Sequence, residues 1–541
     1  MKKLFYLLAF LCFNSCIAQQ ISSAKVFTST KPKLVVGIVV DQMRYEYLFR
    51  FENRYSNDGF KRLMNEGFNC KNNQYHYAST VTGPGHAHVY TGSVPAVSGI
   101  VGNDWFDKVT QKKMYVVSDT SVSVLGEGSK SAGQMSPANL KVTTLTDQLR
   151  IANQFRSKVV GVAIKDRGAI LPAGHTGDAY WFDSSTGNWI SSTHYYDKLP
   201  NWLENFNKKN IAQKYAAIAW ETLYPIDTYV DSEEDIQPYE SKLSGEKEAV
   251  FPHKVDLGSL AVSPWGNTLT LDMALAAVEH EKLGKDDITD FLAISFSSPD
   301  YAGHSFGPQS KEIEDMYLRL DMEIARLLKT LDKEVGIGNY TVFLTADHGV
   351  AEIPAFLRKH KVPAGLLMSS EITKPAQTIL NEKLGEGNWI ISNANYELYL
   401  NRTLMAEKGV SVRQIKDFLA PTINMIDGVY SLINLEEFDN ENIPPFYKEK
   451  LQNIYNPKRS GELMILVEPA WFSGYSTTGT THGSMYAYDT HVPLLFFGNG
   501  INHGETSNFT YISDIAPTIS QLLDIQEPNG SVGTPIKEVL K

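Results

Sequence analysis

The stretch that decides the fold is KLVVGIVV, residues 33–40, followed at once by Asp41. It is a continuous run of apolar, mostly β-branched residues, which is typical of a strand buried on both faces. Further runs of this kind occupy residues 158–164 (KVVGVAI), 291–296 (FLAISF), 341–345 (TVFLT) and 492–497 (VPLLFF). Each run is short enough for a strand, and turn or polar residues follow it.

Segments with a helical pattern separate these strands. They lie at residues 144–155, 268–283 and 311–331, with a further amphipathic segment around residues 47–63 and a hairpin at residues 177–192. Alternating strands and helices predict an α/β fold, doubly wound, with a mostly parallel central sheet flanked by helices.

Two regions interrupt the alternation. Residues 195–264 are acidic and contain no buried strand, whereas residues 350–473 are long and mixed. We interpret both as insertions that form a cap over one face of the core, and ordinary peripheral subdomains are an equally good interpretation.

The overall charge excludes some classes of function. The chain has 541 residues, of which 43% are hydrophobic and 21% charged, as in an ordinary globular protein. Lys and Arg number 50 against 61 Asp and Glu, for a net charge of −11. Because a nucleic-acid binder needs a basic surface, we expect no nucleic-acid partner. A phosphorylated small molecule remains possible, since local cations can override a diffuse negative charge, and nothing argues against a monomer.

The N-terminus has the pattern of a secretory signal peptide at residues 1–18, which leaves residues 19–541 as the mature domain. Lys2 and Lys3 precede an apolar stretch, and small residues end at Ala18. Lipidation at Cys16 fits the flanking residues less well. No later stretch approaches the ~20 apolar residues of a membrane span, so we expect a soluble periplasmic or secreted protein.

Cysteine usage limits the metal chemistry. Two of the three cysteines lie in the predicted signal peptide, so the mature chain keeps Cys70 alone. An internal disulfide and a cysteine-bound zinc are therefore excluded, and any metal must be held by histidine and carboxylate.

Polar residues follow the predicted strands, where an open α/β sheet binds its ligands. They are Asp41, Lys165-Asp166-Arg167, Asp300 with His304, Asp347-His348 and, before the strand at residues 492–497, Thr481-His482-Gly483. Each has an ordinary alternative, because an Asp often caps a turn or helix and a single His often serves in packing. Five such groups of polar residues at one edge of the sheet indicate a functional site.

Six of these residues have the chemistry of two metal centres. Asp41, Asp300, His304, Asp347, His348 and His482 offer oxygen and nitrogen without thiolate, which suits zinc. Asp300 and His304 are four residues apart and can share an ion on a helical turn. Six ligands allow three for each of two ions ~4 Å apart.

Thr82 is the candidate nucleophile, since metal coordination can hold its hydroxyl as an alkoxide. Gly83-Pro84-Gly85 follows it and predicts a short helix whose N-terminus favours an anion. Spacing alone does not separate Thr82 from the hydroxyls of Ser79, Thr80 and Thr91. For His86, His88, His175 and His491 we expect supporting or structural roles.

Together these residues resemble the alkaline phosphatase superfamily. The resemblance rests on Asp41, Thr82-Gly83-Pro84-Gly85-His86, Asp300-x-x-x-His304, Asp347-His348-Gly349 and Thr481-His482-Gly483, and it runs from about residue 33 to the C-terminus. Within the superfamily the chain is similar to the PafA-type periplasmic alkaline phosphatases, which are related to the nucleotide pyrophosphatase/phosphodiesterases. Residues 91–103 are shared in outline by both groups, and Lys165-x-Arg167 is similar to the monoesterases.

The resemblance implies two Zn²⁺ per chain and a broad range of phosphate monoesters as substrates. Asp41, Asp347 and His348 would hold the zinc that coordinates and activates Thr82. Asp300, His304 and His482 would hold the zinc that stabilises the leaving oxygen and then delivers hydroxide. Thr82 would be phosphorylated transiently, giving retention at phosphorus, while Asn103, Lys165 and Arg167 would bind the phosphoryl oxygens.

Charge supports the monoesterase assignment. A monoester carries two negative charges on its non-bridging oxygens, so the extra cations of Lys165 and Arg167 favour it over a diester. Two residues apart on an extended segment, they would point to the same side. The ordinary alternative for this pair is a solvated turn.

Other functions remain open. A phosphodiesterase or nucleotide pyrophosphatase is the main enzymatic alternative, opposed mostly by Lys165 and Arg167. A sulfatase would need a different nucleophile motif, and a cofactor-independent phosphoglycerate mutase would use serine and manganese and would not normally be exported. A non-enzymatic exported metal- or phosphate-binding protein would need the ligands but not Thr82.

Overall fold

The run at residues 33–40 forms β1 (Leu34–Val40), in which every side chain is buried. The computed structural model describes residues 31–474 and 477–541, so the predicted signal peptide lies outside the described residues. β1 pairs in parallel with β9 (Asp290–Phe296) on one side and β10 (Tyr340–Thr345) on the other. The three strands form the centre of a ten-stranded sheet.

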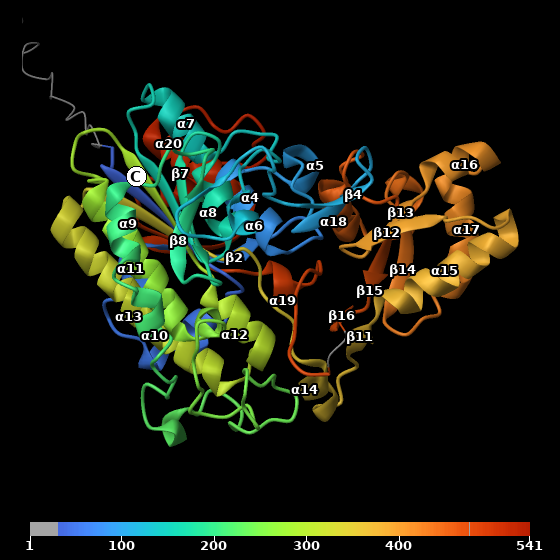
Figure 1. The fold of residues 1–541 in the computed structure, drawn as a ribbon, viewed down its shortest axis with the longest axis horizontal. Helices are drawn as coiled ribbons and strands as arrows, with labels where there is room; N and C mark the ends of the chain where they lie inside the picture. The colour runs from blue at the N-terminus through green and yellow to red at the C-terminus, as the bar shows by residue number, and fades with distance from the viewer. Residues whose placement is uncertain (1–30, 475–476) are drawn as a thin grey trace, which may run out of the picture. The chain divides into compact units, whose positions relative to one another are not determined.

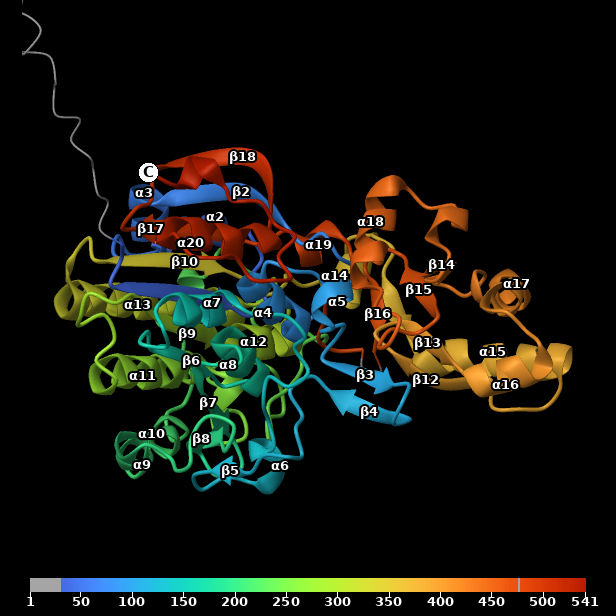
Figure 2. The ribbon, with the colours of Figure 1, turned by 90° about the horizontal axis from the view of Figure 1, so that it is seen from above.

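Five neighbouring strands are parallel, in the order β10, β1, β9, β6 (Val159–Ala163) and β7 (Asp178–Asp183). The complete order is β18 (Gly504–Tyr511), β2 (Phe68–Gln74), β17 (Leu494–Gly498), β10, β1, β9, β6, β7, β8 (Asn188–Ser192) and β5 (Val124–Leu125), which Figure 2 shows from one edge of the sheet to the other. The predicted hairpin corresponds to β7 and β8.

Besides β8 of the hairpin, β17 runs antiparallel to the central strands. β17 pairs antiparallel with β10, so its N-terminal end lies beside the carboxyl end of β10. Because of this reversal, the chain that precedes β17 lies at the same edge as the chain that follows the parallel strands.

Helices cover both faces of the sheet, so the predicted doubly wound α/β class is confirmed (Figure 1). One face carries α3 (Phe60–Glu66), α11 (Pro264–His280) and α13 (Lys311–Leu331), and the other carries α4 (Thr82–Thr91), α7 (Leu145–Ala152), α8 (Asp166–Ala173) and α20 (Ile515–Leu523). The amphipathic segment at residues 47–63 is not one helix: α2 (Tyr47–Arg50) and a 3₁₀ turn (Glu52–Arg54) precede α3.

The first of the two predicted insertions, residues 195–264, contains no strand and only short helices, α9 (Asn201–Asn207) and α10 (Ile211–Tyr215). The second, residues 350–473, contains a separate four-stranded antiparallel sheet, which we call the second sheet. Its strands in order are β12 (Ile390–Ala394), β13 (Glu397–Leu400), β15 (Leu463–Val467) and β14 (Val429–Asn434).

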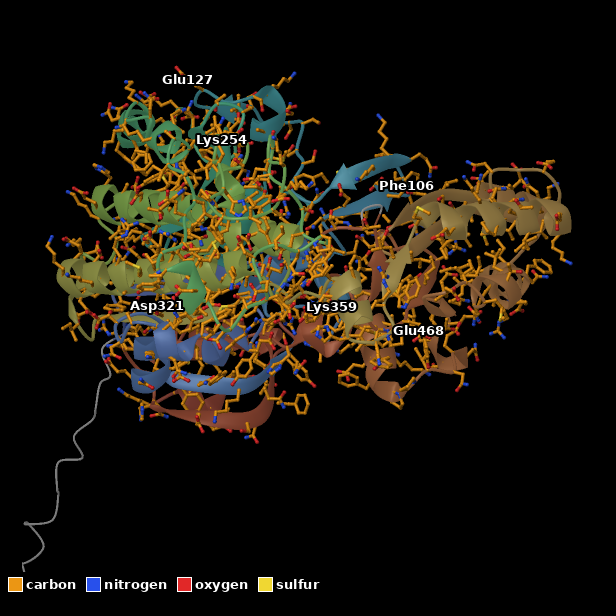
Figure 3. All side chains as sticks on the ribbon, turned by 90° about the horizontal axis from the view of Figure 1, so that it is seen from below. Phe106, Glu127, Lys254, Asp321, Lys359 and Glu468 are labelled. Atoms are coloured by element: carbon orange, nitrogen blue, oxygen red, sulfur yellow. The ribbon has the colours of Figure 1, made fainter. Side chains whose placement is uncertain are left out.

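The second sheet has its own apolar core, formed with α15 (Ser369–Leu384), α16 (Arg402–Lys408) and α17 (Val412–Ile423) (Figure 2). A hairpin of β3 (Asp104–Asp107) and β4 (Lys112–Tyr115) reaches it from the core, and Phe106 lies against Tyr399 with ring centroids 5.7 Å apart (Figure 3). The remaining α-helices and strands of the described residues are α5 (Pro95–Ser98), α6 (Lys130–Gly133), α12 (Ser298–Phe306), α14 (Pro354–Lys359), α18 (Pro445–Ile454), α19 (Ala487–Thr490), β11 (Gly365–Leu367) and β16 (Trp471–Ser473). Across the two described ranges, no helix has both the length and the apolar character needed to cross a membrane.

Candidate active site

Two clusters of possible metal ligands lie at the edge where the parallel strands end. The Asp41 cluster consists of Asp41, directly after β1, and Asp347 and His348, after β10. Their ligand atoms lie within 4.8 Å of one another. His348 Nε2 is 3.5 Å from Asp41 Oδ1 and 3.5 Å from Asp347 Oδ2. The bend after β10 lets two adjacent residues face one point.

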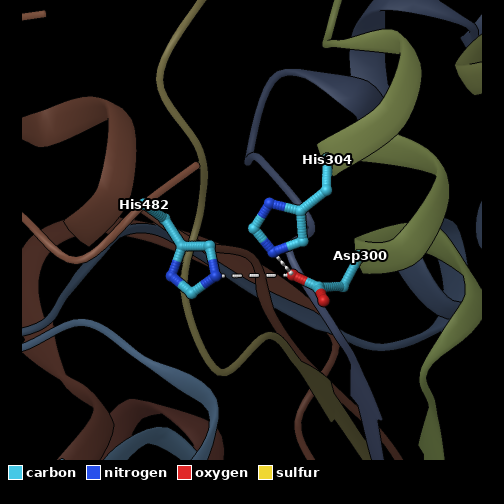
Figure 4. A group of neighbouring side chains, drawn as sticks. All are labelled: Asp300, His304 and His482. Atoms are coloured by element: carbon cyan, nitrogen blue, oxygen red, sulfur yellow. Dashed lines mark ion pairs between the residues drawn. The ribbon is translucent and has the colours of Figure 1, made fainter. Parts of the chain in front are cut away.

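The Asp300 cluster consists of Asp300, His304 and His482 (Figure 4). α12 is helical from its first turn, so Asp300 and His304 lie on one face, with 3.2 Å between Asp300 Oδ1 and His304 Nε2. His482 comes from the loop before β17, and its Nε2 is 3.5 Å from the same oxygen. The antiparallel course of β17 therefore brings this distant histidine to the site.

The three histidines of these clusters are held in one orientation by backbone carbonyls. Nδ1 of His348 donates to Gly349 at 2.9 Å, Nδ1 of His304 to Thr480 at 2.8 Å, and Nδ1 of His482 to Thr80 at 2.7 Å. A carbonyl oxygen can only accept, so each Nδ1 carries the proton and each Nε2 presents a lone pair to its cluster. This arrangement is the usual one for histidines that bind metals.

Buried atoms of the Asp41 cluster fit a cation. Among the described residues, Asp41 Oδ1, Asp347 Oδ2 and His348 Nε2 have no hydrogen-bond partner. Burial and the neighbouring Asp347 raise the pKa of Asp41 well above its usual value, and burial lowers the pKa of His348 to about 3. Buried polar atoms without a partner are costly, so this donor set fits a divalent ion that would compensate them.

Thr82 is the first residue of α4, and two cations lie beside its hydroxyl. Lys165 Nζ is 3.5 Å from Thr82 Oγ1, and Arg167 Nη2 is 3.4 Å from it. Gly85, one helical turn further, is necessary for close packing because a Cβ there would collide with the backbone of Asp347. The cations single out Thr82, since Thr80 Oγ1 instead donates to the carbonyl of Ser484 at 2.6 Å.

Asn103 completes the group around Thr82. Its Oδ1 accepts a hydrogen bond from the backbone N–H of Gly83 at 2.7 Å. This contact fixes the side-chain amide beside the first turn of α4, and in the described structure its Nδ2 makes no hydrogen bond. The amide N–H groups are therefore available to an oxygen bound next to Thr82.

The prediction that Lys165 and Arg167 lie on one extended segment is wrong in part. Lys165 has extended backbone angles, but it is the N-terminal cap of α8, and Arg167 is already within that helix. The two cations reach Thr82 because the start of α8 lies close to the start of α4. Packing of two helix N-termini, rather than two-residue periodicity, aligns them.

Lys165 also links the two clusters. Its Nζ lies 2.7 Å from Asp41 Oδ2 and 2.5 Å from Asp300 Oδ2. Although burial favours the neutral amine, Asp300 and Asp41 raise the pKa of Lys165, so it stays charged. Burial also opposes ionisation of Asp300, but His304 and Lys165 hold the pKa of Asp300 well below its usual value.

Two residues of the site were not expected from the sequence. Gln42 joins both clusters, because its backbone N–H donates to Asp347 Oδ1 at 3.1 Å and its Nε2 donates to Asp300 Oδ1 at 2.7 Å. Gly303, within the Asp300-x-x-x-His304 motif, leaves room for it, since a Cβ at this position would collide with Gln42 Oε1. In the sequence, the position of Gln42 directly after Asp41 is what could have indicated its role in the site.

Tyr115 is the second unexpected contact, and it orients Arg167. Arg167 Nη1 donates to Tyr115 Oη at 3.1 Å, and that hydroxyl donates to Asp166 Oδ1 at 2.5 Å. Tyr115 belongs to the hairpin of β3 and β4, far from any motif, so nothing in its sequence surroundings indicates this position.

The histidines expected in supporting roles lie outside both clusters. His86 is closest, with Nδ1 3.3 Å from Asp347 Oδ2 and Nε2 2.7 Å from Ser295 Oγ. Contacts of the other three are structural: His88 Nε2 with Ser98 Oγ, His175 Nδ1 with Asp147 Oδ2, and His491 Nε2 with the Lys71 carbonyl.

Comparison with known proteins extends these observations to the whole chain. The family model described as type I phosphodiesterase / nucleotide pyrophosphatase matches residues 35–489. A protein of Myroides odoratus named "Calcium-transporting ATPase" is 47% identical, with 94% of this chain and 95% of that protein covered. Alkaline phosphatase PafA of Elizabethkingia meningoseptica is 44% identical, with 97% of each chain covered.

Solved structures of alkaline phosphatase PafA have the same fold. The wild-type structure superposes with a TM-score of 0.92 at 45% identity, covering 94% of this chain and 99% of that one. A second PafA structure is of a variant substituted at a threonine, an asparagine, a lysine and an arginine, which have the same order and spacing along the chain as Thr82, Asn103, Lys165 and Arg167. The chain thus belongs to the type I phosphodiesterase / nucleotide pyrophosphatase family, and within it to the PafA-type alkaline phosphatases.

Proposed function

We propose that this alkaline phosphatase hydrolyses a broad range of phosphate monoesters with Thr82 as its nucleophile and releases inorganic phosphate. The observation that carries the proposal is the convergence on Thr82 Oγ1 of Lys165 Nζ and Arg167 Nη2, at 3.5 Å and 3.4 Å. Two fixed cations beside a nucleophile suit the two negative charges of a phosphate monoester.

The two clusters would each hold one Zn²⁺. Carboxylate oxygens and imidazole nitrogens, with three protein ligands at each centre, are a usual zinc environment that leaves a position open. Bound there, the two ions would supply Lewis acidity at the oxygen of Thr82 and at the leaving oxygen.

The chain's own residues define the remaining steps. Thr82 Oγ1 attacks phosphorus, the bond to the leaving oxygen breaks, and a phosphothreonine results. Asn103 Nδ2, Lys165 and Arg167 bind the non-bridging oxygens as charge develops on them. Water then breaks the Thr82–phosphorus bond, so two inversions give retention at phosphorus.

The decisive experiment is the ratio of kcat/KM for an aryl phosphate monoester and its matching diester, measured on zinc-loaded protein. A ratio far above one supports a phosphomonoesterase. A ratio below one contradicts the proposal and favours a phosphodiesterase, the second candidate, which the family model's description brings into consideration.

Trapping tests the nucleophile directly. Protein quenched in acid during turnover of a monoester should carry a phosphoryl group on Thr82, detected by peptide mass spectrometry. A phosphoryl group on Ser79, Thr80 or Thr91 alone would contradict the assignment. Elemental analysis of protein purified without added metal should find two zinc ions per chain, and another metal would refute that identity.

We also propose that the chain is exported by a signal peptide at residues 1–18, on the pattern of Lys2, Lys3 and the apolar stretch after them. N-terminal sequencing of protein from the periplasmic and extracellular fractions should begin at Gln19. A mature protein that retains Met1 would contradict export by cleavage.

A further inference from the structure

A cavity of about 360 Å³ opens beside the Asp300 cluster. One wall comes from the core, with Ser79, Val81 and the segment Thr481–Gly483. The opposite wall comes from the second sheet and its neighbours, through Leu367, Ile372 and the turn between β12 and β13. Its size lies at the lower end of the range for small-molecule sites, roughly 300–1,000 Å³.

The cavity lies on one side of the candidate reaction centre. Of the six possible metal ligands, His482 alone lines it, and Lys165, Arg167 and Asn103 do not. It therefore adjoins the cluster assigned to the leaving oxygen, away from the cations that would bind the phosphoryl oxygens. Val81, next to Thr82 in the chain, is one of its lining residues.

The lining has a definite chemical character. Leu367, Ile372, Ile465 and the ring of Tyr396 give it an apolar side, and the remaining lining side chains are small or uncharged polar groups. No Asp, Glu, Lys or Arg lines it within the described part of the chain. Asn393 makes no side-chain hydrogen bond among the described residues, so its amide can serve a ligand. Such a lining favours a neutral group with an apolar face.

The wall formed by the second sheet is fixed relative to the active site. Asn395 and Tyr396 form a tight turn with φ of 54° and 64°. Asn395 Nδ2 donates to the carbonyl of Asp104 at 2.8 Å. Asp104 directly follows Asn103 in the chain, so this hydrogen bond ties the turn to the active site. Tyr396 Oη accepts from the backbone N–H of Ser473 at 2.9 Å, which holds the ring in place. A preformed wall loses little entropy on binding.

We propose that this cavity is the leaving-group subsite, and that it binds neutral alcohols with an aromatic or other flat apolar face in preference to small alkyl or anionic alcohols. The proposal rests on the proposed function, because it places the leaving oxygen at the Asp300 cluster. It adds the chemical class of leaving group that the enzyme selects.

The test compares benzyl phosphate with methyl phosphate, whose alcohols have similar acidity. Ala394→Trp fills the cavity from the turn, and Ser369→Phe fills it from the start of α15. Each variant should lower kcat/KM for benzyl phosphate about tenfold and leave methyl phosphate within about twofold. The matched control is Ala217→Trp, at an exposed alanine that does not line the cavity. It should leave kcat/KM unchanged for both esters.

Inhibition gives a second readout that does not depend on turnover. Wild-type protein should bind benzylphosphonate about tenfold more tightly than methylphosphonate, and Ala394→Trp should remove this difference. A carboxylate at the far end of the benzyl ring should weaken binding, because the lining offers it no cation.

Equal losses for both esters, or no loss for either, would overturn the subsite. If Ala394→Trp fails to fold, judged by its thermal unfolding, Ser369→Phe decides. Failure of the proposed function is distinguishable, because wild-type protein would then not hydrolyse methyl phosphate, or Thr82→Ala would hydrolyse it.

Discussion

The Asp41 and Asp300 clusters use the same kinds of ligand in different proportions and different surroundings. The Asp41 cluster has two carboxylates and one histidine, all with fully buried side chains. The Asp300 cluster has one carboxylate and two histidines, and the side chain of His304 is 35% exposed. With the carboxylates ionised and the histidines neutral, as they would be around a bound metal, the first cluster carries a charge of −2 and the second −1.

This difference suits the two roles we propose. Two carboxylates would balance a divalent ion in the fully buried cluster, whereas one carboxylate would leave excess positive charge where we propose that a leaving oxygen develops negative charge. His304 of the second cluster is accessible to solvent, and His482 of the same cluster lines the cavity, which agrees with the leaving-group side that we propose. Burial and ligand charge, rather than ligand type, separate the two sides of the site.

Replacing Thr82 should have the largest effect, because it removes the proposed nucleophile. We expect Thr82→Ala to lower monoester turnover by about 10⁴-fold or more with metal content unchanged. Thr82→Ser, which keeps a hydroxyl, should retain much more activity. Activity in Thr82→Ala close to that of the wild type would remove the functional distinction between the clusters.

Removing one histidine from each cluster tests the comparison directly. His348→Ala and His482→Ala should each lower kcat/KM by about 10³-fold for an aryl monoester. For an alkyl monoester, His482→Ala should lower kcat/KM by about tenfold more than it does for the aryl monoester, because the poorer leaving group needs more charge stabilisation. His348→Ala should lower kcat/KM equally for both esters. Steady-state kinetics over a series of leaving groups measures this, and parallel slopes for the two variants would show that the clusters do not differ in role.

Lys165 bridges the clusters, so its removal tests whether the site recognises charge. Lys165→Ala with Arg167→Ala should lower kcat/KM for a monoester by about 10²-fold more than for the matching diester, since a monoester has one more negative charge. Lys165→Arg with Arg167→Lys keeps the charges and is the control. Equal losses on monoester and diester would refute the assignment of this pair to the phosphoryl oxygens.

Gln42 is the neutral link between the clusters, and Gly303 gives it room. Gly303→Ala should displace Gln42 from Asp300 and weaken metal affinity at the Asp300 cluster about tenfold. In a metal titration, the double variant Gln42→Ala with Gly303→Ala should bind metal as tightly as Gln42→Ala alone. Without the glutamine side chain, a Cβ at position 303 has nothing to collide with. Additive losses in this double-mutant cycle would mean that Gly303 acts independently of Gln42.

The smallest effect concerns the support of α12, which carries the Asp300 cluster. His253 packs against Phe306 of α12, with its Nε2 2.9 Å from Glu312 and its Nδ1 3.1 Å from Glu246. Burial favours neutral imidazole, but Glu312 and Glu246 raise the pKa of His253. The stability that this proton supplies is present below the ordinary pKa and is lost as pH rises through the raised one.

His253→Gln should therefore destabilise the protein more at about pH 6 than at about pH 10, with a difference of about 1 kcal/mol in the free energy of unfolding. Denaturant titrations of wild type and variant at both pH values measure it. A difference that grows with pH would mean that His253 is neutral in the folded protein.

Much of the fold was predictable because a buried parallel strand has a strong signature. The runs that became β1, β6, β9, β10 and β17 were all recognised, and residues of the site follow each of the first four within a few positions. By contrast, β2 (FNCKNNQ) and β18 (GETSNFTY) were missed. Strands towards the edge of a sheet need not be apolar on both faces, so they lack that pattern.

The site was predictable where its chemistry is concentrated in short motifs. Asp300 and His304 share one helical turn, and Asp347 and His348 are adjacent, so sequence spacing alone suggested shared ions. Gln42 and Tyr115 were not predicted. Their contribution comes from hydrogen bonds across the fold, and an ordinary glutamine or tyrosine in a sequence does not indicate its partner.

The amino-acid sequence by itself determined the buried strands and the residue types at their carboxyl ends. Because no cysteine is among those residues, it also determined that any metal is bound by oxygen and nitrogen atoms. The tertiary structure decided which ligands share a cluster, because the antiparallel β17 brings His482 to Asp300. It also decided that α4 and α8 point Thr82, Lys165 and Arg167 at one place. The physical reason is range: strand and helix patterns arise from neighbouring residues, whereas the convergence of side chains far apart in sequence depends on how those elements pack.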